Sequence, residues 1–128
     1  MDPMQYVDFA SDDIENAMAK LTPAEIDQLA FGAIQLRGDG TVLHFNAAEG
    51  EITGRDPAKM IGRNFFTDIA PCTNTPVFRG VFDQGVKTGL LNARLDYLFD
   101  HQMAPQRVKV HMKKAMVGNT YWIFVKRL

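Results

Sequence analysis

Residues 64–73 read Asn64-Phe65-Phe66-Thr67-Asp68-Ile69-Ala70-Pro71-Cys72-Thr73 and hold the only cysteine of the 128-residue chain, among aromatic and aliphatic neighbours. One thiol cannot form an internal disulfide, so Cys72 is left with packing, metal ligation or reaction with a molecule from outside the chain. On this stretch alone, packing as a small buried side chain is the commonest outcome. Pro71 fixes the backbone before the cysteine, and Thr75-Pro76 predicts a helix start just after it.

The length and composition predict one domain with a sizeable core, because 46% of the 128 residues are hydrophobic. Fourteen basic and fifteen acidic residues leave a formal net charge of −1, which offers no field to attract nucleic acid or an anionic membrane. The segment 1–5 lacks the basic start and apolar core of a secretory signal, and no apolar run is long enough to span a membrane. We therefore expect a reducing, cytoplasmic setting, with no nucleic-acid or membrane partner. We also expect a monomer.

The first 31 residues predict a short helical cap. Asp12 and Glu15 have the spacing of a capping box for a first helix. The segment Thr22-Pro23-Ala24-Glu25 combines a capping residue, a first-turn proline and an acidic third position at the start of a second helix. Helices this short are not stable alone, so we expect them to lie on another surface and to be the least stable unit of the fold. Their apolar contacts would come from Phe9, Ile14, Met18, Leu21, Ile26, Leu29 and Phe31.

Residues 32–128 predict one compact unit that starts with a hairpin. Two strands, 32–36 and 41–45, flank Arg37-Gly38-Asp39-Gly40, whose glycines would supply the positive φ of a tight turn. The Arg-Gly-Asp triplet is a motif of cell adhesion, but the turn chemistry already explains these residues.

Helical segments are expected between residues 46 and 89. A capping box is predicted at Asn46-Ala47-Ala48-Glu49, and Asp56-Pro57 starts a further short helix that ends at Gly62. The strongest helix signal is an amphipathic stripe closed by Gly89. Its apolar positions are Phe78, Val81, Phe82, Gly85 and Val86.

The last third predicts three strands, near 91–99, 107–116 and 121–127, with 117–120 as the final turn. The run 121–125 is apolar on both faces, as a central strand covered by two layers requires. The element order therefore predicts an α+β domain with a five-stranded antiparallel sheet, helices mainly on one face and a short helical N-terminal cap. This order is similar to that of PAS-type sensor domains.

A closer resemblance covers nearly the whole chain and lies in short motifs. They are 31–36 (FGAIQL), 46–50 (NAAEG), 52–57 (ITGRDP), 61–62 (IG), 64–66 (NFF), 70–73 (APCT), 108–114 (VKVHMKK), Trp122 and 124–127 (FVKR). In these motifs the chain resembles the photoactive yellow protein family, blue-light photoreceptors with a PAS fold.

The resemblance implies that Cys72 carries p-coumaric acid (4-hydroxycinnamic acid) as a covalent thioester. It also implies that Glu49 is the carboxylic acid bound to the chromophore phenolate, Thr53 a supporting hydroxyl and Arg55 a cation that closes the pocket to solvent. The matching pocket-wall positions are Phe65, Ile69, Phe99 and Met103. In two places the chain departs from the family, because Phe45 and His101 stand where tyrosines are usual.

Elementary chemistry is consistent with these roles. A phenol in water titrates near about 10, so an ionised phenol in an apolar pocket needs strong hydrogen bonds, which a protonated Glu49 can supply. A buried carboxyl group favours its neutral form. If Glu49 gives its proton to the phenolate after light-driven isomerisation, the bare carboxylate destabilises the fold and opens the N-terminal cap.

Three functional hypotheses follow. The first is the thioester-linked blue-light receptor, which passes its signal to an unnamed downstream protein. The second is a chromophore-free PAS-type sensory or protein-interaction module in which Cys72 is unmodified. The third is a cysteine-dependent enzyme or redox sensor, which needs a histidine base near the thiol. The candidate bases are His44, His101 and His111, and no spacing in the sequence places one of them beside Cys72.

Overall fold

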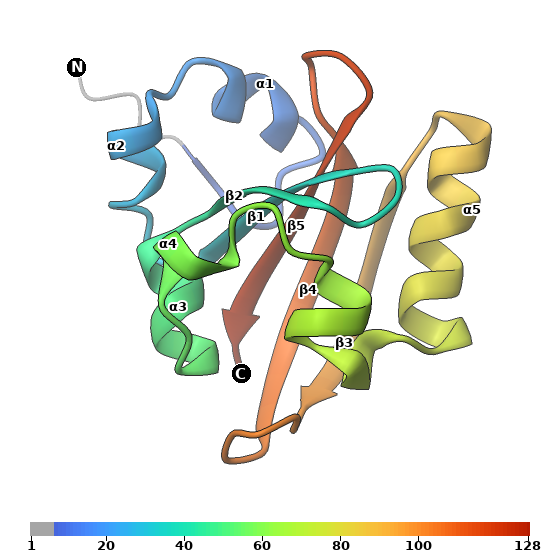
Figure 1. The fold of residues 1–128 in the computed structure, drawn as a ribbon. Coiled ribbons are helices and arrows are strands. Elements are labelled where there is room, and N and C mark those ends of the chain that lie inside the picture. Colours follow the sequence, from blue (N-terminus) through green and yellow to red (C-terminus); the bar gives the residue numbers. More distant parts are fainter. Residues whose placement is uncertain (1–6) are drawn as a thin grey trace.

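The computed structural model describes residues 7–128 and contains one five-stranded antiparallel sheet with the strand order β2-β1-β5-β4-β3 (Figure 1). The strands are β1 (Gly32–Arg37), β2 (Val42–Phe45), β3 (Asn92–Phe99), β4 (Gln106–Lys114) and β5 (Thr120–Arg127). The predicted α+β class and five-stranded sheet are confirmed, with strand ends that differ by a few residues from those expected. Residues 1–6 lie outside the described residues. They include segment 1–5, used to judge the signal peptide, and the start of the predicted cap.

Strand β5 lies at the centre of the sheet, between β1 and β4. Its side chains alternate between two apolar clusters: Tyr121, Ile123 and Val125 belong to the inner cluster, on the side of the longer helices. Trp122 and Phe124 belong to the outer cluster, on the side of the cap. This two-sided burial explains the continuous apolar run and confirms the prediction of a central strand.

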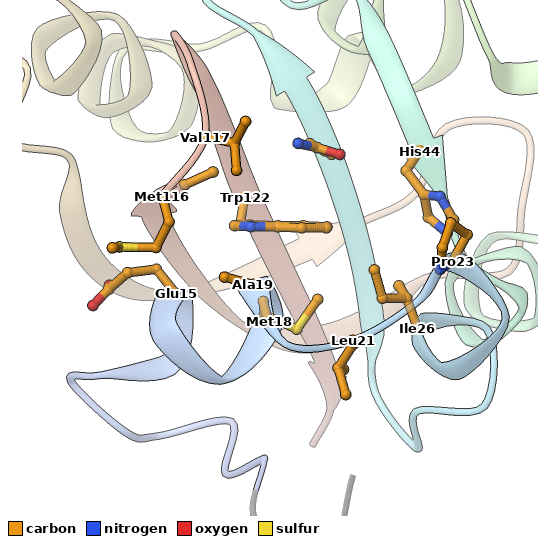
Figure 2. A pocket seen from close by; sticks show the side chains of 12 residues that line it. Glu15, Met18, Ala19, Leu21, Pro23, Ile26, His44, Met116, Val117 and Trp122 are labelled. Atoms are coloured by element: carbon orange, nitrogen blue, oxygen red, sulfur yellow. The ribbon is translucent and has the colours of Figure 1, made fainter. Parts of the chain in front are cut away.

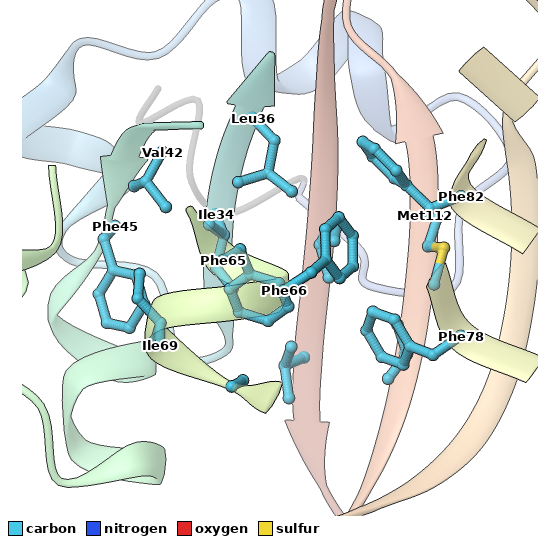
Figure 3. Packing of buried hydrophobic residues seen from close by; sticks show 14 of the residues in the cluster. Ile34, Leu36, Val42, Phe45, Phe65, Phe66, Ile69, Phe78, Phe82 and Met112 are labelled. Carbon is cyan, nitrogen blue, oxygen red and sulfur yellow. The ribbon is translucent and has the colours of Figure 1, made fainter. Parts of the chain in front are cut away.

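The inner face of the sheet is covered by the helical segments between β2 and β3 (Figure 1). They are α3 (Ala47–Thr53), α4 (Pro57–Met60), a π-helical turn (Phe65–Ile69), a 3-10 turn (Pro71–Thr73), a second π-helical turn (Pro76–Gly80) and α5 (Val81–Thr88). Phenylalanine rings dominate the packing (Figure 3), with centroids 5.4 Å apart for Phe65 and Phe66 and 5.2 Å apart for Phe66 and Phe82. The predicted amphipathic helix is confirmed in α5, which ends at Gly89 with φ 73°.

The outer face carries the cap helices α1 (Ile14–Ala19) and α2 (Pro23–Ile26). The predicted capping box of α2 is confirmed, since Thr22 and Glu25 exchange both hydrogen bonds. The capping role predicted for Asp12 is wrong: α1 begins after Asp13 without a side-chain cap, and the Asp12 carboxylate instead pairs with Arg94 on β3. A long-range partner has replaced the local one.

The hairpin between β1 and β2 uses one glycine with positive φ instead of two. Gly40 has φ 93°, whereas Gly38 does not lie in the left-handed region. A Cβ at Gly38 would lie 3.0 Å from a methyl carbon of Val86, so close packing against α5 explains this glycine better than the turn geometry does.

Residues 7–128 lack two features that would point to other functions. No helix among them is long and apolar enough to cross a membrane. They also contain no group of three or more His, Cys, Asp or Glu side chains that could hold a metal ion. The division into a cap (1–31) and a compact unit (32–128) stays a prediction.

Candidate functional site

Glu49 is a buried acid with no hydrogen-bond partner among residues 7–128, the part of the chain that the structure describes. It lies in the first turn of α3, its side chain is fully buried, and neither carboxyl oxygen contacts a donor. Burial raises the pKa of Glu49 from 4.5 to about 8, because the apolar surroundings disfavour the carboxylate. The acid is therefore neutral at neutral pH and can donate a proton to a ligand.

The Glu49 carboxyl group lies against the backbone of β1. A Cβ on Gly32 would lie 2.0 Å from Glu49 Oε2, which leaves no room for any side chain at that position. Glycine at 32 therefore creates the space into which the acid turns. The inward turn also explains why the capping box predicted at 46–49 is half formed: Asn46 caps the Glu49 amide, but Glu49 makes no return bond.

Asn46 connects this acid to the cap. Its Oδ1 accepts from the backbone N–H groups of Ala33 (2.9 Å) and Glu49 (3.0 Å). Its Nδ2 donates to the backbone carbonyls of Ile26 (2.9 Å), the last residue of α2, and Phe31 (3.1 Å). One fully buried side chain thus ties α3, β1 and α2 together. The sequence indicated only its local capping role.

Thr53 and Arg55 follow Glu49 along the same segment. The Thr53 hydroxyl, which is buried, donates to the Glu49 backbone carbonyl at 2.8 Å and keeps its lone pairs free. The half-buried Arg55 guanidinium donates to the carbonyls of Thr53 (2.9 Å), Ile69 (3.1 Å) and His101 (2.8 Å). It joins the end of α3 to the π-helical turn Phe65–Ile69 and to the loop between β3 and β4.

Cys72 lies in the 3-10 turn Pro71–Thr73, half-buried and packed against the inner cluster. The Tyr97 hydroxyl donates to the Cys72 carbonyl at 2.5 Å and lies 2.9 Å from the Thr75 hydroxyl. Tyr97 therefore holds the turn that carries the sulfur. Sequence reasoning missed it, although its place on β3, two residues before Phe99, was a usable signal.

The predicted pocket-wall residues gather in the inner cluster. Phe45, Phe65, Ile69 and Phe99 are each 3% exposed or less, and Met103 is half-buried against them. Figure 3 shows Phe45, Phe65 and Ile69 within this layer. The cluster thus brings the wall residues and Cys72 into one layer of the molecule.

Two of the three histidines contact the cap. His44 Nε2 lies 3.4 Å from Asp27 Oδ1, and His111 Nδ1 lies 2.8 Å from the Phe9 carbonyl. Burial lowers the pKa of His111, which favours the neutral ring. His101 contributes its carbonyl to Arg55.

Comparisons with known proteins show which family the chain belongs to. The family model described as PAS fold matches residues 20–125. A photoactive yellow protein of Rhodothalassium salexigens is 61% identical over 125 residues, which are 98% of this chain and 100% of that protein. The corresponding figures for one from Halochromatium salexigens are 58%, 98% and 100%.

Among solved structures, the photoactive yellow protein domain of the sensor histidine kinase Ppr from Rhodospirillum centenum superposes with a TM-score of 0.85. It is 48% identical, and the match covers 89% of this chain and 100% of that one. The chain therefore belongs to the photoactive yellow protein family and has its PAS fold.

Proposed function

We propose that the chain is a blue-light receptor in which p-coumaric acid is attached to Cys72 as a thioester. Family membership supports a photoreceptor. The residues of this chain fit the group: the thiol of Cys72 packs against an aromatic layer, and the buried Glu49 has both carboxyl oxygens free of a partner among the described residues. Attachment would join the acyl carbon of an activated coumarate to the Cys72 sulfur, while the activating group leaves with the thiol proton.

When bound, the group supplies light absorption and isomerisation of its double bond. The chain supplies a proton and an anion site. Glu49 is neutral at neutral pH because its pKa is about 8, so it can donate a charge-assisted hydrogen bond to a phenolate. Arg55 holds the π-helical turn Phe65–Ile69 and the loop between β3 and β4 against the end of α3, and in the proposed receptor it would limit access of water to the pocket.

Loss of the Glu49 proton would create a buried anion. The rise of the pKa from 4.5 to about 8 corresponds to about 5 kcal/mol against the charged form. A whole domain is stable by about 5–15 kcal/mol, so this penalty exceeds what its weakest part can withstand.

Asn46 carries the disturbance to the cap. It caps the Glu49 amide and also holds the carbonyl of Ile26 in α2, so a shift of α3 weakens the attachment of the cap directly. We infer that release of the N-terminal cap is the output signal. The competing function, a colourless PAS-type interaction module, would give no use to a buried acid without a partner.

The observation that carries this proposal is the unpartnered, fully buried Glu49 carboxyl group. The test is intact-mass spectrometry of the chain made in a host that produces activated p-coumarate, with Cys72→Ala as the control. We expect one coumaroyl group and a yellow colour in the parent, and neither in a folded Cys72→Ala variant. A colourless parent of unmodified mass would favour the interaction module.

A further inference from the structure

The cap covers an apolar area of the outer sheet face. The sheet contributes Ala33, Ala115, Trp122 and Phe124 to the outer cluster, and the cap contributes Ile14 and Met18 of α1 together with residues around α2. Ile14 is fully buried and Met18 is 2% exposed. Departure of the cap would uncover this whole area to water.

Two cations frame the same face. Arg94 on β3 donates to the Ala10 carbonyl at 2.9 Å and to the Asp12 carboxylate at 2.6 Å. Lys113 on β4 donates to the Asp12 carbonyl at 2.7 Å and pairs with the Glu15 carboxylate at 3.1 Å. Lys113 and Glu15 are largely shielded, with side-chain exposures of 16% and 13%, so loss of the cap would leave Lys113 without its anion in an apolar rim.

A pocket that is partly open to solvent lies beside the cap. A cavity of about 230 Å³ lies between α1, α2 and the sheet, and Figure 2 shows Trp122, Met18, Leu21 and Ile26 around it. An enclosed apolar cavity of about 150 Å³ can bind benzene, so a pocket of this size has room for a ring or a large aliphatic side chain. A different helix with a larger side chain could fill it better than the cap does.

The apolar area continues past the edge of the cap. Met116 borders the cavity and is 57% exposed, and the neighbouring Val117 is 70% exposed. Methionine side chains adapt to different partners because they are flexible and polarisable. The surface offered to an incoming segment is thus wider than the one the cap uses.

We propose that this face docks an acidic amphipathic helix of a signalling protein, which replaces the cap once the cap has been released. The segment 12–18 is the template for that helix: carboxylates at Asp12 and Glu15 meet Arg94 and Lys113, and Ile14 and Met18 form its apolar face. Charge complementarity selects an acidic partner, and the cavity selects one with a larger apolar side chain. This inference rests on the proposed function, because light is what releases the cap.

The test first separates docking from light. In the full chain without chromophore, Ile14→Lys combined with Met18→Lys should release α1 in the dark, because two lysines cannot stay in an apolar cluster. The probe is a fluorescent synthetic peptide with the sequence of residues 8–29. We expect binding to the double variant at least tenfold tighter than to the parent. Phe9→Lys is a second release variant. It replaces the double variant if that protein shows no cooperative unfolding transition and is therefore not folded.

Charge exchange then tests the partner chemistry. In the release variant, Lys113→Glu should weaken peptide binding at least tenfold, and a peptide carrying Glu15→Lys should restore it. Lys87→Glu, an exposed change of the same charge on α5, is the matched control and should have no effect. Equal binding by all these proteins, or no binding to either release variant, would overturn the proposal.

Peptide binding to the pigmented parent, measured in the dark and under illumination, tests the effect of light. Peptide binding only under illumination supports both the docking face and the light mechanism. Binding to the release variant, with none to the illuminated parent, upholds the docking face and contradicts the proposed light-driven release.

Discussion

The inner and outer apolar layers of the sheet differ in whether their carboxyl groups have a cation beside them. In the inner layer, Glu49 is fully buried and both its oxygens lack a partner. In the outer layer, the carboxylates of Asp12 and Glu15 pair with Arg94 and Lys113; the Asp12 pair is exposed to water, whereas the Glu15 pair is largely shielded. A negative charge made at Glu49 therefore has no cation beside it, whereas each of these outer carboxylates has one. The difference explains how a change at one face can be expressed at the other.

The largest expected effect is on the pH dependence of stability. The folded protein keeps the Glu49 proton up to about pH 8, while the unfolded chain loses it near 4.5, so stability should fall as the pH rises between these values. The loss from this group is about 5 kcal/mol. Glu49→Gln should remove that part of the slope. Denaturant unfolding of both apoproteins from pH 4 to 9 measures it, and parallel curves would show that the acid is not buried in solution.

A cavity in the inner layer should lower global stability. Phe66 is fully buried and its ring lies between those of Phe65 and Phe82. Phe66→Ala should cost about 3–5 kcal/mol in the free energy of unfolding. The exposed Val77, changed to Ala, is the control and should change the unfolding free energy by less than about 0.5 kcal/mol.

A cavity in the outer layer should have a local effect instead. Ile14→Ala removes a fully buried side chain, and we expect a loss of about 2–5 kcal/mol that falls on cap opening alone. Hydrogen exchange of residues 7–29 should accelerate at least tenfold, while exchange in β5 stays near that of the parent. Equal acceleration in both segments would mean that the cap and the sheet unfold together.

A hydroxyl added to the inner layer should secure the pigment's charge. Phe45 is buried in the inner cluster, and Phe45→Tyr offers a phenolate one more donor. A hydrogen bond to a charged group is worth about 1.5–3 kcal/mol, so the midpoint of acid bleaching should fall by about one to two pH units. Phe31→Tyr makes the same change in the outer layer and should leave the midpoint unchanged. Absorbance titration of the pigmented proteins checks both.

The smallest expected effect belongs to the ion pairs at the rim. Glu15→Gln leaves the shielded Lys113 without an anion and should weaken cap docking by about 1–2 kcal/mol. Asp12→Asn, at a far more exposed carboxylate, should do less, and high salt should remove its effect. Hydrogen exchange of the cap at low and high salt measures both effects. A larger effect of Asp12→Asn than of Glu15→Gln would show that solvent exposure does not control the strength of the pairs.

Periodicity and local capping signals were enough to predict most of the fold. Patterns only a few residues long predict three elements correctly: the apolar run predicts β5, the apolar stripe predicts α5, and the Thr22 capping box predicts the start of α2. The Asp12 prediction failed because Arg94, far along the chain, competes for the same carboxylate. Capping rules consider only residues that are close in the sequence, so they cannot predict a distant partner such as Arg94.

The candidate site was harder to predict, since its important contacts are long-range. The resemblance to a known family identified the candidate site residues. No sequence pattern predicted that Gly32 leaves space for Glu49 or that Tyr97 bonds to the Cys72 carbonyl. Asn46 was recognised for one hydrogen bond of the four that it makes. These contacts join segments that only the finished fold brings together.

The central place of β5 has a consequence for biosynthesis. Strand β1 pairs with β5 over Gly32–Arg37, so the first strand made waits for Thr120–Arg127 before it gains its second neighbour. Until then the ribosome exposes a nascent hairpin whose apolar face has no sheet to join. Contacts of such high sequence separation slow folding, and unpaired strand edges invite aggregation while they last. The five-stranded sheet thus becomes complete only once Thr120–Arg127 has been translated.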